Sequence, residues 1–172
     1  MSPVSSRLVS KAKAVLVAAF VGLGGLMLFF YLYANSYQPE LQQVSMDLQT
    51  VKVLDVDKIN KRADLEVDYV LYNPTSVTST ISTIDYDLIA NGKDVGQGHY
   101  SVEDIPMAGR PALFPNSNMT VTDKFELVDS PNISDIYDSI LKGDPVKYEA
   151  KGQVTIESTL TLITKSFDST LG

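Results

Sequence analysis

The sequence predicts an all-β fold, an antiparallel β-sandwich with one short helix, preceded by a single transmembrane α-helix. An uncharged apolar run fills residues 14–34, and after it apolar and polar residues alternate in about seven short segments separated by turn residues. A period of two is typical of strands with one buried face, and seven such strands indicate a sandwich. We divide the chain into a basic tail (1–13), the helix, a linker (35–40) and the sandwich domain (41–172).

The apolar run is long enough to cross a bilayer. Its 21 residues carry no charge, and as a helix they would span roughly 30 Å. Basic residues precede the run and none follows until Lys52, so the positive-inside rule places the N-terminus in the cytoplasm and the domain outside the cell membrane. The basic residues of the tail are Arg7, Lys11 and Lys13. The tyrosines that gather at the outer end, where such rings favour the interface, are Tyr31, Tyr33 and Tyr37.

Two further features of the run have alternative readings. A cleaved signal peptide is the rival to an anchor, but its apolar region is usually about 7–15 residues long, and cleavage after Ala34 would put Leu32 at a position that prefers small residues. Ala14, Ala18 and Gly22 recur every four residues. Such a face lets a second helix approach closely, although Ala and Gly are also common in membrane helices generally.

The composition limits the function classes. The chain has 172 residues, enough for one domain, and no Cys, which excludes disulfides, thiolate zinc sites and a Cys nucleophile. Beyond residue 34 it has 21 acidic and 11 basic residues, a net charge of about −10. Such a domain should repel nucleic acid, so we expect no nucleic-acid partner.

The first strands follow from alternation. Residues 44–48 alternate, and the phase then slips at Val51 and Val53, which indicates a bulge. Residues 63–71 point apolar side chains one way and acidic ones the other, up to the Asn73-Pro74 pair. Proline cannot donate to a ladder, so the strand should end there.

A hairpin and a helix complete the prediction. Residues 84–90 alternate up to the tight-turn pair Asn91-Gly92, and residues 95–102 should return as the partner strand, with Gly96 and Gly98 marking a bulge. Another alternating run covers 119–127, with Asp123 in its apolar row at an edge or bulge position. The apolar residues of 133–141 have helical spacing with Gly143 to end the helix, and two strands follow at 146–157 and 160–167.

Catalytic chemistry has few candidates in this chain. The one histidine, His99, lies in a strand beside Gly98, where a surface or hairpin role is commoner than metal binding. No nucleophile elbow, metalloprotease helix or phosphate-binding loop is present. We therefore expect no catalytic residues, no cofactor, no small-molecule substrate and no enzymatic activity.

Weak candidates for a cation site and for modification remain. Acidic pairs share a strand face at Asp55/Asp57, Glu66/Asp68 and Asp85/Asp87, and alternate carboxylates can chelate a hard cation. The best cluster is Asp55, Asp57 and Asn60, which lacks the glycine and distal glutamate of an EF-hand loop. The alternative is that these acidic pairs simply lie on the solvent-exposed faces of half-buried strands. Sequons for glycosylation begin at Asn118 and Asn132.

The segment LYNPTSVTSTISTIDYDLIANGKDVGQG contains three features in order: Asn73-Pro74 after an alternating strand, the Asn91-Gly92 turn, and Gly96 with Gly98. This pattern resembles the WHy (water stress and hypersensitive response) domain of group 2 late-embryogenesis-abundant (LEA) proteins. The stretch KYEAKG at 147–152, after the helix, is similar to the family's following strand. The resemblance covers about residues 41–168.

The resemblance implies an immunoglobulin-like or fibronectin-III-like sandwich with one short helix, often behind a membrane anchor, and a link to desiccation and stress tolerance. It brings no catalytic residues. Two functional readings stay open at this point: a membrane-tethered protective or surface protein, and an accessory subunit of a larger membrane complex. In the second, the anchor packs beside other transmembrane subunits and the sandwich caps an outer face.

Overall fold

The computed structural model describes residues 4–36, 38–105 and 110–171, with side chains described from Lys13 on. Two compact units are present, which meet in sequence between Tyr37 and Gln38. The first contains the helix α1 (Val4–Ser36). It is the one helix among the described residues that is long and apolar enough to cross a membrane, and every described side chain from Lys13 to Tyr33 is exposed. Of the three predicted interfacial tyrosines, Tyr37 lies outside the described residues.

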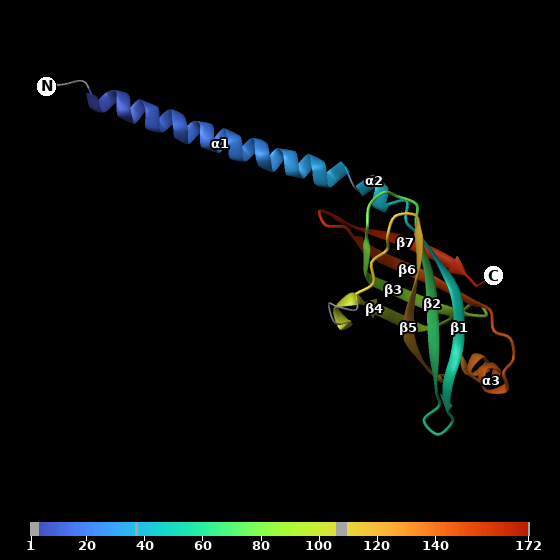
Figure 1. Cartoon of the computed structure of the whole chain (residues 1–172). Coiled ribbons are helices and arrows are strands. Elements are labelled where there is room, and N and C mark those ends of the chain that lie inside the picture. Colours follow the sequence, from blue (N-terminus) through green and yellow to red (C-terminus); the bar gives the residue numbers. More distant parts are fainter. Residues whose placement is uncertain (1–3, 37, 106–109, 172) are drawn as a thin grey trace. The chain divides into compact units, whose positions relative to one another are not determined.

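The second unit is built from two antiparallel sheets (Figure 1). A three-stranded sheet has the order β1-β2-β5, and a four-stranded sheet has the order β4-β3-β6-β7. Their strands are β1 (Ser45–Asp57), β2 (Arg62–Asn73), β3 (Thr80–Ala90), β4 (Lys93–Ser101), β5 (Ser117–Val128), β6 (Tyr148–Glu157) and β7 (Leu162–Thr170). Among the described residues of this unit, three short helices accompany the strands: α2 (Gln38–Leu41), the 3-10 helix η1 (Val102–Asp104) and α3 (Ser134–Lys142). This confirms the mostly β, two-sheet architecture; α2 occupies part of the predicted linker.

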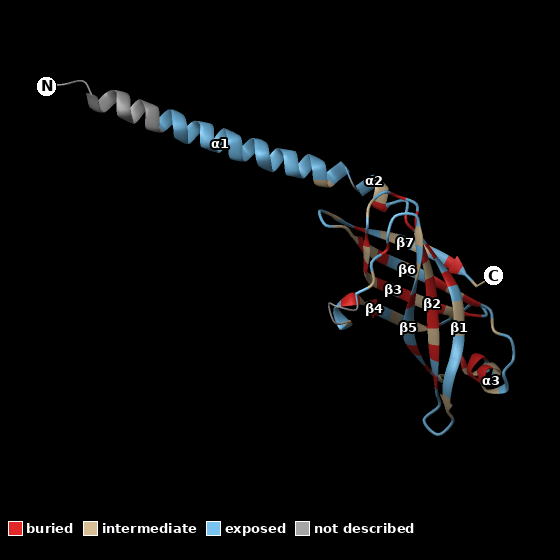
Figure 2. Ribbon diagram, viewed as in Figure 1, coloured by how far each residue is buried: buried red, intermediate tan, exposed pale blue. Residues whose placement is uncertain are grey.

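The core lies between the two sheets, where Figure 2 shows the buried residues alternating along the strands. The predicted apolar row of β2 points inward: Leu65, Val67, Tyr69 and Leu71 are fully buried. On β1, Val53, which follows the predicted slip, is exposed. The predicted slip in β1 appears as two register shifts against β2, between Leu48 and Thr50 and between Val53 and Asp55. Shifts of this kind let a long edge strand follow the twist of its neighbour.

The turns are made by the residues that the sequence singles out. Asn91 (φ 48°) and Gly92 (φ 81°) both adopt positive φ, as a two-residue hairpin turn requires. Gly143 ends α3 in the left-handed region (φ 72°), and its N–H donates to the carbonyl of Ile140. The helix then lays Ile136, Tyr137 and Ile140 against the core.

Asn73, the first residue of the Asn-Pro pair, has a structural role at the end of β2. Its buried amide donates to the carbonyls of Val77 (2.8 Å) and Leu113 (3.2 Å). Its Oδ1 accepts from the backbone N–H (3.0 Å) and hydroxyl (2.7 Å) of Thr75. One side chain therefore ties together β2, the 74–79 loop and the segment before β5.

Replacing Asn73 with alanine should destabilise the domain by about 2–4 kcal/mol, because it removes four hydrogen bonds in a buried region. The Leu113 carbonyl still accepts from the Ser79 N–H, whereas the Thr75 N–H loses its acceptor. Chemical denaturation at neutral pH measures the change. Asn118→Ala, an exposed asparagine on β5, is the control and should change stability by less than about 0.5 kcal/mol. Equal stability of the two variants would contradict this role for Asn73.

Candidate functional site

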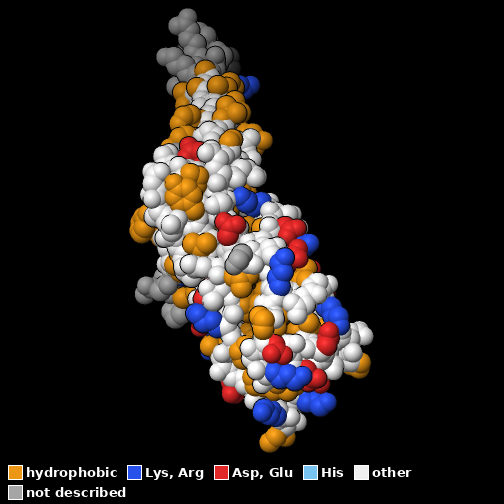
Figure 3. Space-filling view, turned by 90° about the vertical axis from the view of Figure 1, so that its right-hand side faces the viewer, with side chains coloured by type: hydrophobic (Ala, Val, Ile, Leu, Met, Phe, Trp, Pro, Cys, Tyr) orange, Lys and Arg blue, Asp and Glu red, His pale blue; other side chains and the backbone are white. Residues whose placement is uncertain are grey.

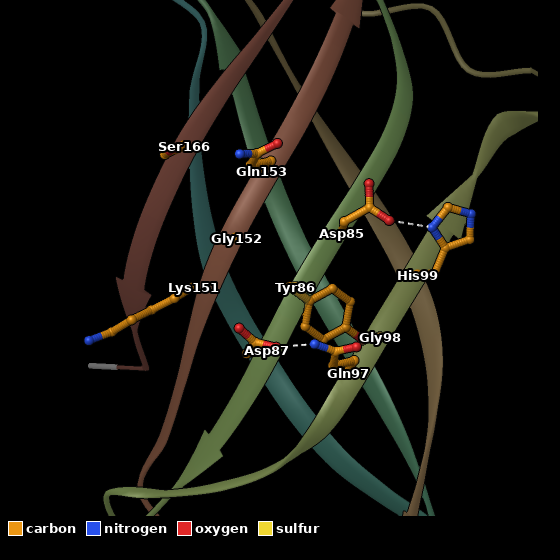
Figure 4. Close-up of a pocket in the computed structure, with 10 residues that line it drawn as sticks. All are labelled: Asp85, Tyr86, Asp87, Gln97, Gly98, His99, Lys151, Gly152, Gln153 and Ser166. Atoms are coloured by element: carbon orange, nitrogen blue, oxygen red, sulfur yellow. Dashed lines mark hydrogen bonds and ion pairs between the residues drawn. The ribbon is translucent and has the colours of Figure 1, made fainter.

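The outer face of the four-stranded sheet holds a polar cleft of about 480 Å³ (Figure 4). Two rows of outward side chains border it, and they lie two residues apart along the strands: Asp85, His99, Gln153 and Ser166 form one row, and Asp87, Gln97 and Lys151 form the other. The lining residues are Asp85, Tyr86, Asp87, Gln97, Gly98, His99, Lys151, Gly152, Gln153 and Ser166. Between the rows, Tyr86 pairs with Gly98 on one side and Gly152 on the other, so backbone forms the floor.

The register of β3 and β4 brings His99 beside Asp85. The imidazole Nδ1 lies 2.6 Å from Asp85 Oδ1, and both side chains are largely exposed. In the second row, the Gln97 amide donates to Asp87 at 3.0 Å. The pairing of His99 with Asp85 is an interaction that we did not anticipate from the sequence.

This arrangement does not form a nucleophilic triad with the serine in the cleft. Ser166 lies on β7, three strands away from His99 on β4. Adjacent strands are about 4.8 Å apart, so the hydroxyl is on the order of 14 Å from the imidazole. Nucleophile and base must be within hydrogen-bond reach for acyl-transfer chemistry.

Lys151 supplies the positive charge of the cleft and is held by two carboxylates. Its ammonium lies 2.6 Å from Glu149 and 3.4 Å from Asp168. The hydrogen bond to Glu149 and the charge of Asp168 raise the pKa of Lys151, which stays protonated. Exposed pairs of this kind contribute little to stability, so they mainly neutralise and order the face.

A half-buried acid on the facing three-stranded sheet contacts the inner side of β3. Asp123, on the edge strand β5, accepts a 2.9 Å hydrogen bond from the Tyr86 hydroxyl. The edge alternative of the sequence prediction is confirmed, since Asp123 pairs with Val67 without a bulge. Burial raises the pKa of Asp123, and burial likewise raises the pKa of Tyr86, which stays neutral as the donor.

The raised pKa of Asp123 has a consequence for stability. The folded pKa lies above the ordinary value of 3.8, so the folded state binds the proton more tightly than the unfolded state. The buried carboxyl therefore lowers the free energy of unfolding least at low pH. This destabilisation grows as the pH rises through the folded pKa. Asp123→Asn, whose amide oxygen still accepts from Tyr86, should be more stable than wild type at pH 7, and this advantage should shrink towards pH 4.

Thermal melts across this pH range test the effect. Asp168→Asn, an exposed carboxylate on the outer face, controls for the loss of one negative charge. Asp123→Ala, which deprives the Tyr86 hydroxyl of its acceptor, should lose about 1–3 kcal/mol. A stability gain for Asp123→Asn that does not change with pH would show that ionisation of Asp123 is not its source.

The predicted cation cluster lies at the β1–β2 hairpin, in a second polar cleft of about 460 Å³. Asp57 is engaged in the turn: its Oδ1 accepts from the backbone N–H of Ile59 and Asn60, and its Oδ2 accepts from the Asn60 amide at 2.6 Å. These bonds lower the pKa of Asp57. Within residues 4–36, 38–105 and 110–171, no group of three or more His, Asp and Glu residues is arranged to hold a metal ion.

The other predicted site residues are all exposed. Asn118 lies near the start of β5, and Asn132 lies in the turn before α3, so glycosylation at either remains a prediction. Ala14, Ala18 and Gly22 lie at intervals of four residues on α1. A methyl group added at Gly22 would meet no atom within 4 Å, so this face of α1 is open.

No protein-family model and no curated protein matches the chain. Among solved structures, it is similar to a protein described as a late embryogenesis abundant (LEA) protein, At2g46140.1, with 15% identity over 97% of this chain and 90% of that chain and a TM-score of 0.35. AT1g01470 from Arabidopsis thaliana shows 14% identity over 74% and 78% of the two chains, with a TM-score of 0.43. A protein from Archaeoglobus fulgidus shows 18% identity over 73% and 98%, with a TM-score of 0.37.

These similarities do not establish a family, because the identities are below 20% and the TM-scores are below 0.5. What the chain itself shows is an apolar helix that is long enough to span a membrane, followed by a β-sandwich with polar clefts on its outer faces.

Proposed function

We propose that the protein is a non-catalytic, membrane-anchored β-sandwich protein whose domain lies outside the cell membrane, with a protective or surface role of the kind associated with WHy and group 2 LEA proteins. The observation that carries the proposal is the direct joining of an exposed apolar helix to a compact acidic domain. The division of strands into three and four is compatible with an immunoglobulin-like or fibronectin-III-like sandwich.

The charged faces of the domain suggest how such protection would operate. Two basic side chains on the three-stranded sheet are paired: Lys52 lies 2.9 Å from Glu66, and Arg62 lies 2.8 Å from Glu126. Because acids outnumber bases by ten beyond residue 34, carboxylates remain in excess over the whole domain and keep a layer of water and counter-ions. A tethered domain of this kind would hydrate the membrane surface and keep neighbouring molecules apart by charge repulsion.

The absence of catalysis is part of the proposal. The His99–Asp85 pair is exposed and far from Ser166, and Lys151 is held by Glu149 and Asp168. The charged side chains of the cleft, Asp85, Asp87, His99 and Lys151, thus each have a partner within the domain. We expect no hydrolase activity and no cofactor.

A second role, as an accessory subunit of a membrane complex, is favoured by a groove on the domain and by one face of α1. An open apolar groove of about 240 Å³ lies between β1 and α3, lined by Val51, Val53, Ile140, Val146, Tyr148 and Leu171 among others. Grooves beside edge strands accept partner segments, and the open Ala14/Ala18/Gly22 face of α1 could pack against a partner helix.

Extraction of native membranes with a mild detergent, followed by a native gel, separates the two roles. Migration as a monomer or small homo-oligomer supports the free-standing protective role, and a deletion strain should then survive drying or osmotic stress less well. Migration in a discrete large complex would overturn that role and identify the partner subunits directly.

A further inference from the structure

Exposed apolar side chains gather at the end of the sandwich where the chain first enters it. Four large ones form what we call the apolar rim: Tyr72 (43% exposed), Phe114 (60%), Leu160 (42%) and Leu162 (58%). Tyr72 is at the end of β2, Phe114 precedes β5, and the two leucines belong to the β6–β7 hairpin. Large apolar groups that share one end of a domain often mark an interaction surface.

The end of the domain that carries the rim is built from four stretches of chain that contain no charged residue: 41–46, 69–84, 111–122 and 158–164. The rim residues come from the last three of them. The fold brings them together. Tyr72 pairs with Ser45 on β1 and with Asn118 on β5. Ser79 bridges to Leu113, and Thr80 pairs with Glu157, which in turn pairs with Leu162.

Few charges border the rim, and two of them have partners within the domain. Glu40 accepts a 3.0 Å hydrogen bond from the Ser76 hydroxyl. The Lys165 ammonium donates to the carbonyls of Gln42 (3.1 Å) and Val44, and burial lowers the pKa of Lys165. These contacts also fix α2, whose Leu41 is fully buried, at this end of the sandwich.

The remote end of the domain differs from the rim in its charge. It also exposes apolar side chains, Leu54, Ile59 and Val128 among them, but there they stand among charged residues. The β1–β2 hairpin displays Asp55, Lys58, Lys61, Arg62 and Asp64 around Ile59. In Figure 3, charged side chains crowd the lower end of the domain, whereas uncharged and apolar atoms predominate at its upper left. The domain is thus polarised, with an uncharged end and a charged end.

We propose that the apolar rim inserts into the headgroup region of the bilayer, so that the domain is docked on the membrane instead of swinging from its anchor. The inference rests on the proposed anchoring by α1. One residue separates Ser36, the end of α1, from Gln38, the start of α2, so the chain between them spans at most about 7 Å. The rim therefore lies at the end of the domain that the anchor holds at the interface.

The chemistry of the rim selects the kind of membrane contact. Tyr, Phe and Leu side chains are those that partition into the interface. The domain carries excess negative charge, so anionic headgroups would not attract it. Docking should therefore depend on apolar insertion, should occur on zwitterionic phosphatidylcholine, and should persist at about 1 M NaCl, where the Debye length is only about 3 Å.

Single-site fluorescence on the full-length protein in phosphatidylcholine vesicles tests the proposal. Because the chain has no Cys, an environment-sensitive maleimide probe can be placed at Phe114→Cys or Leu162→Cys. Ile59→Cys, at a position 93% exposed on the remote hairpin, is the matched control, and Leu23→Cys reports on the anchor. We expect blue-shifted emission and several-fold weaker iodide quenching at 114 and 162 than at 59, and quenching by lipids spin-labelled near the headgroup.

The outcomes separate the docking from the anchoring. If position 23 is quenched by deeply spin-labelled lipids but 114 and 162 behave like 59, the anchor stands and rim docking is refuted. If position 23 is also water-exposed, the proposed anchoring itself fails. Protection of the rim in native membranes but not in the pure lipid vesicles would show that a protein covers it, and would equally overturn a lipid contact.

Discussion

Replacing Gly152 with alanine is expected to destabilise the domain by at least about 3 kcal/mol. Gly152 lies on β6 opposite Tyr86, in the middle of the four-stranded sheet. A methyl group there would overlap the carbonyl oxygen of Asp85 and come within 2.7 Å of the Tyr86 Cα. The obstructing atoms are backbone on an adjacent strand, which cannot turn aside as a side chain would, so the two strands must separate.

Denaturant unfolding of the domain measures this loss. Gln153→Ala changes the neighbouring, exposed residue on the same strand and should shift stability by less than about 0.5 kcal/mol. Gly98→Ala places its methyl group against the buried Tyr86 ring. Displacing a side chain costs less than separating two strands, so this variant should lose less stability than Gly152→Ala. If Gly152→Ala were as stable as Gln153→Ala, the β3–β6 packing described above would be wrong.

The second large effect concerns the anchor. Between residues 14 and 34, eleven Leu, Val and Phe residues contribute roughly −3 to −7 kcal/mol to insertion. One arginine near the centre costs about 3 kcal/mol, which this sum can absorb. Leu23→Arg alone should therefore weaken retention, whereas Leu23→Arg with Leu26→Arg costs about 6–7 kcal/mol and should release most of the protein from the membrane.

Carbonate washing and flotation of membranes give the measurement. Leu23→Ala with Leu26→Ala removes the same two leucines at a cost of only about 1 kcal/mol and should remain in the membrane fraction. Quantitative retention of the double arginine variant would contradict the assignment of α1 as a spanning helix.

The sequence predicts the strands of this domain well because a strand with one buried face has apolar residues at every second position. The row from Leu65 to Leu71 and the stop at Asn73 both appear where expected. The order of strands is less accessible, since β2 pairs with β5 across more than forty intervening residues. No local pattern specifies that pairing.

The polar cleft shows why the site was harder to predict than the strands. Counting back from the Asn91-Gly92 turn alone would place Asp85 opposite Gly98. The register shift opposite Leu88 and Ile89 moves the ladder by one residue and places His99 there instead. A one-residue slip reverses which side chains share a face, so the His99–Asp85 contact depends on a bulge whose presence was predicted but whose exact register was not.

The apolar rim also depends on strand pairing that the sequence does not reveal. Its four uncharged stretches can be read directly from the chain, but each is short and typical of loops. Only the pairings of Tyr72, Ser79 and Leu162 place them at one end of the sandwich.

The measurement that tests the central claim most directly is the sidedness of two single cysteines in intact cells. Ile59→Cys, on the remote hairpin of the domain, and Ser5→Cys, in the basic tail, are each treated with a membrane-impermeant maleimide. The account predicts labelling of position 59 in intact cells and of position 5 only after permeabilisation. Labelling of position 5 but not of position 59 in intact cells would show that the domain faces the cytoplasm, and would contradict a membrane-anchored domain displayed outside.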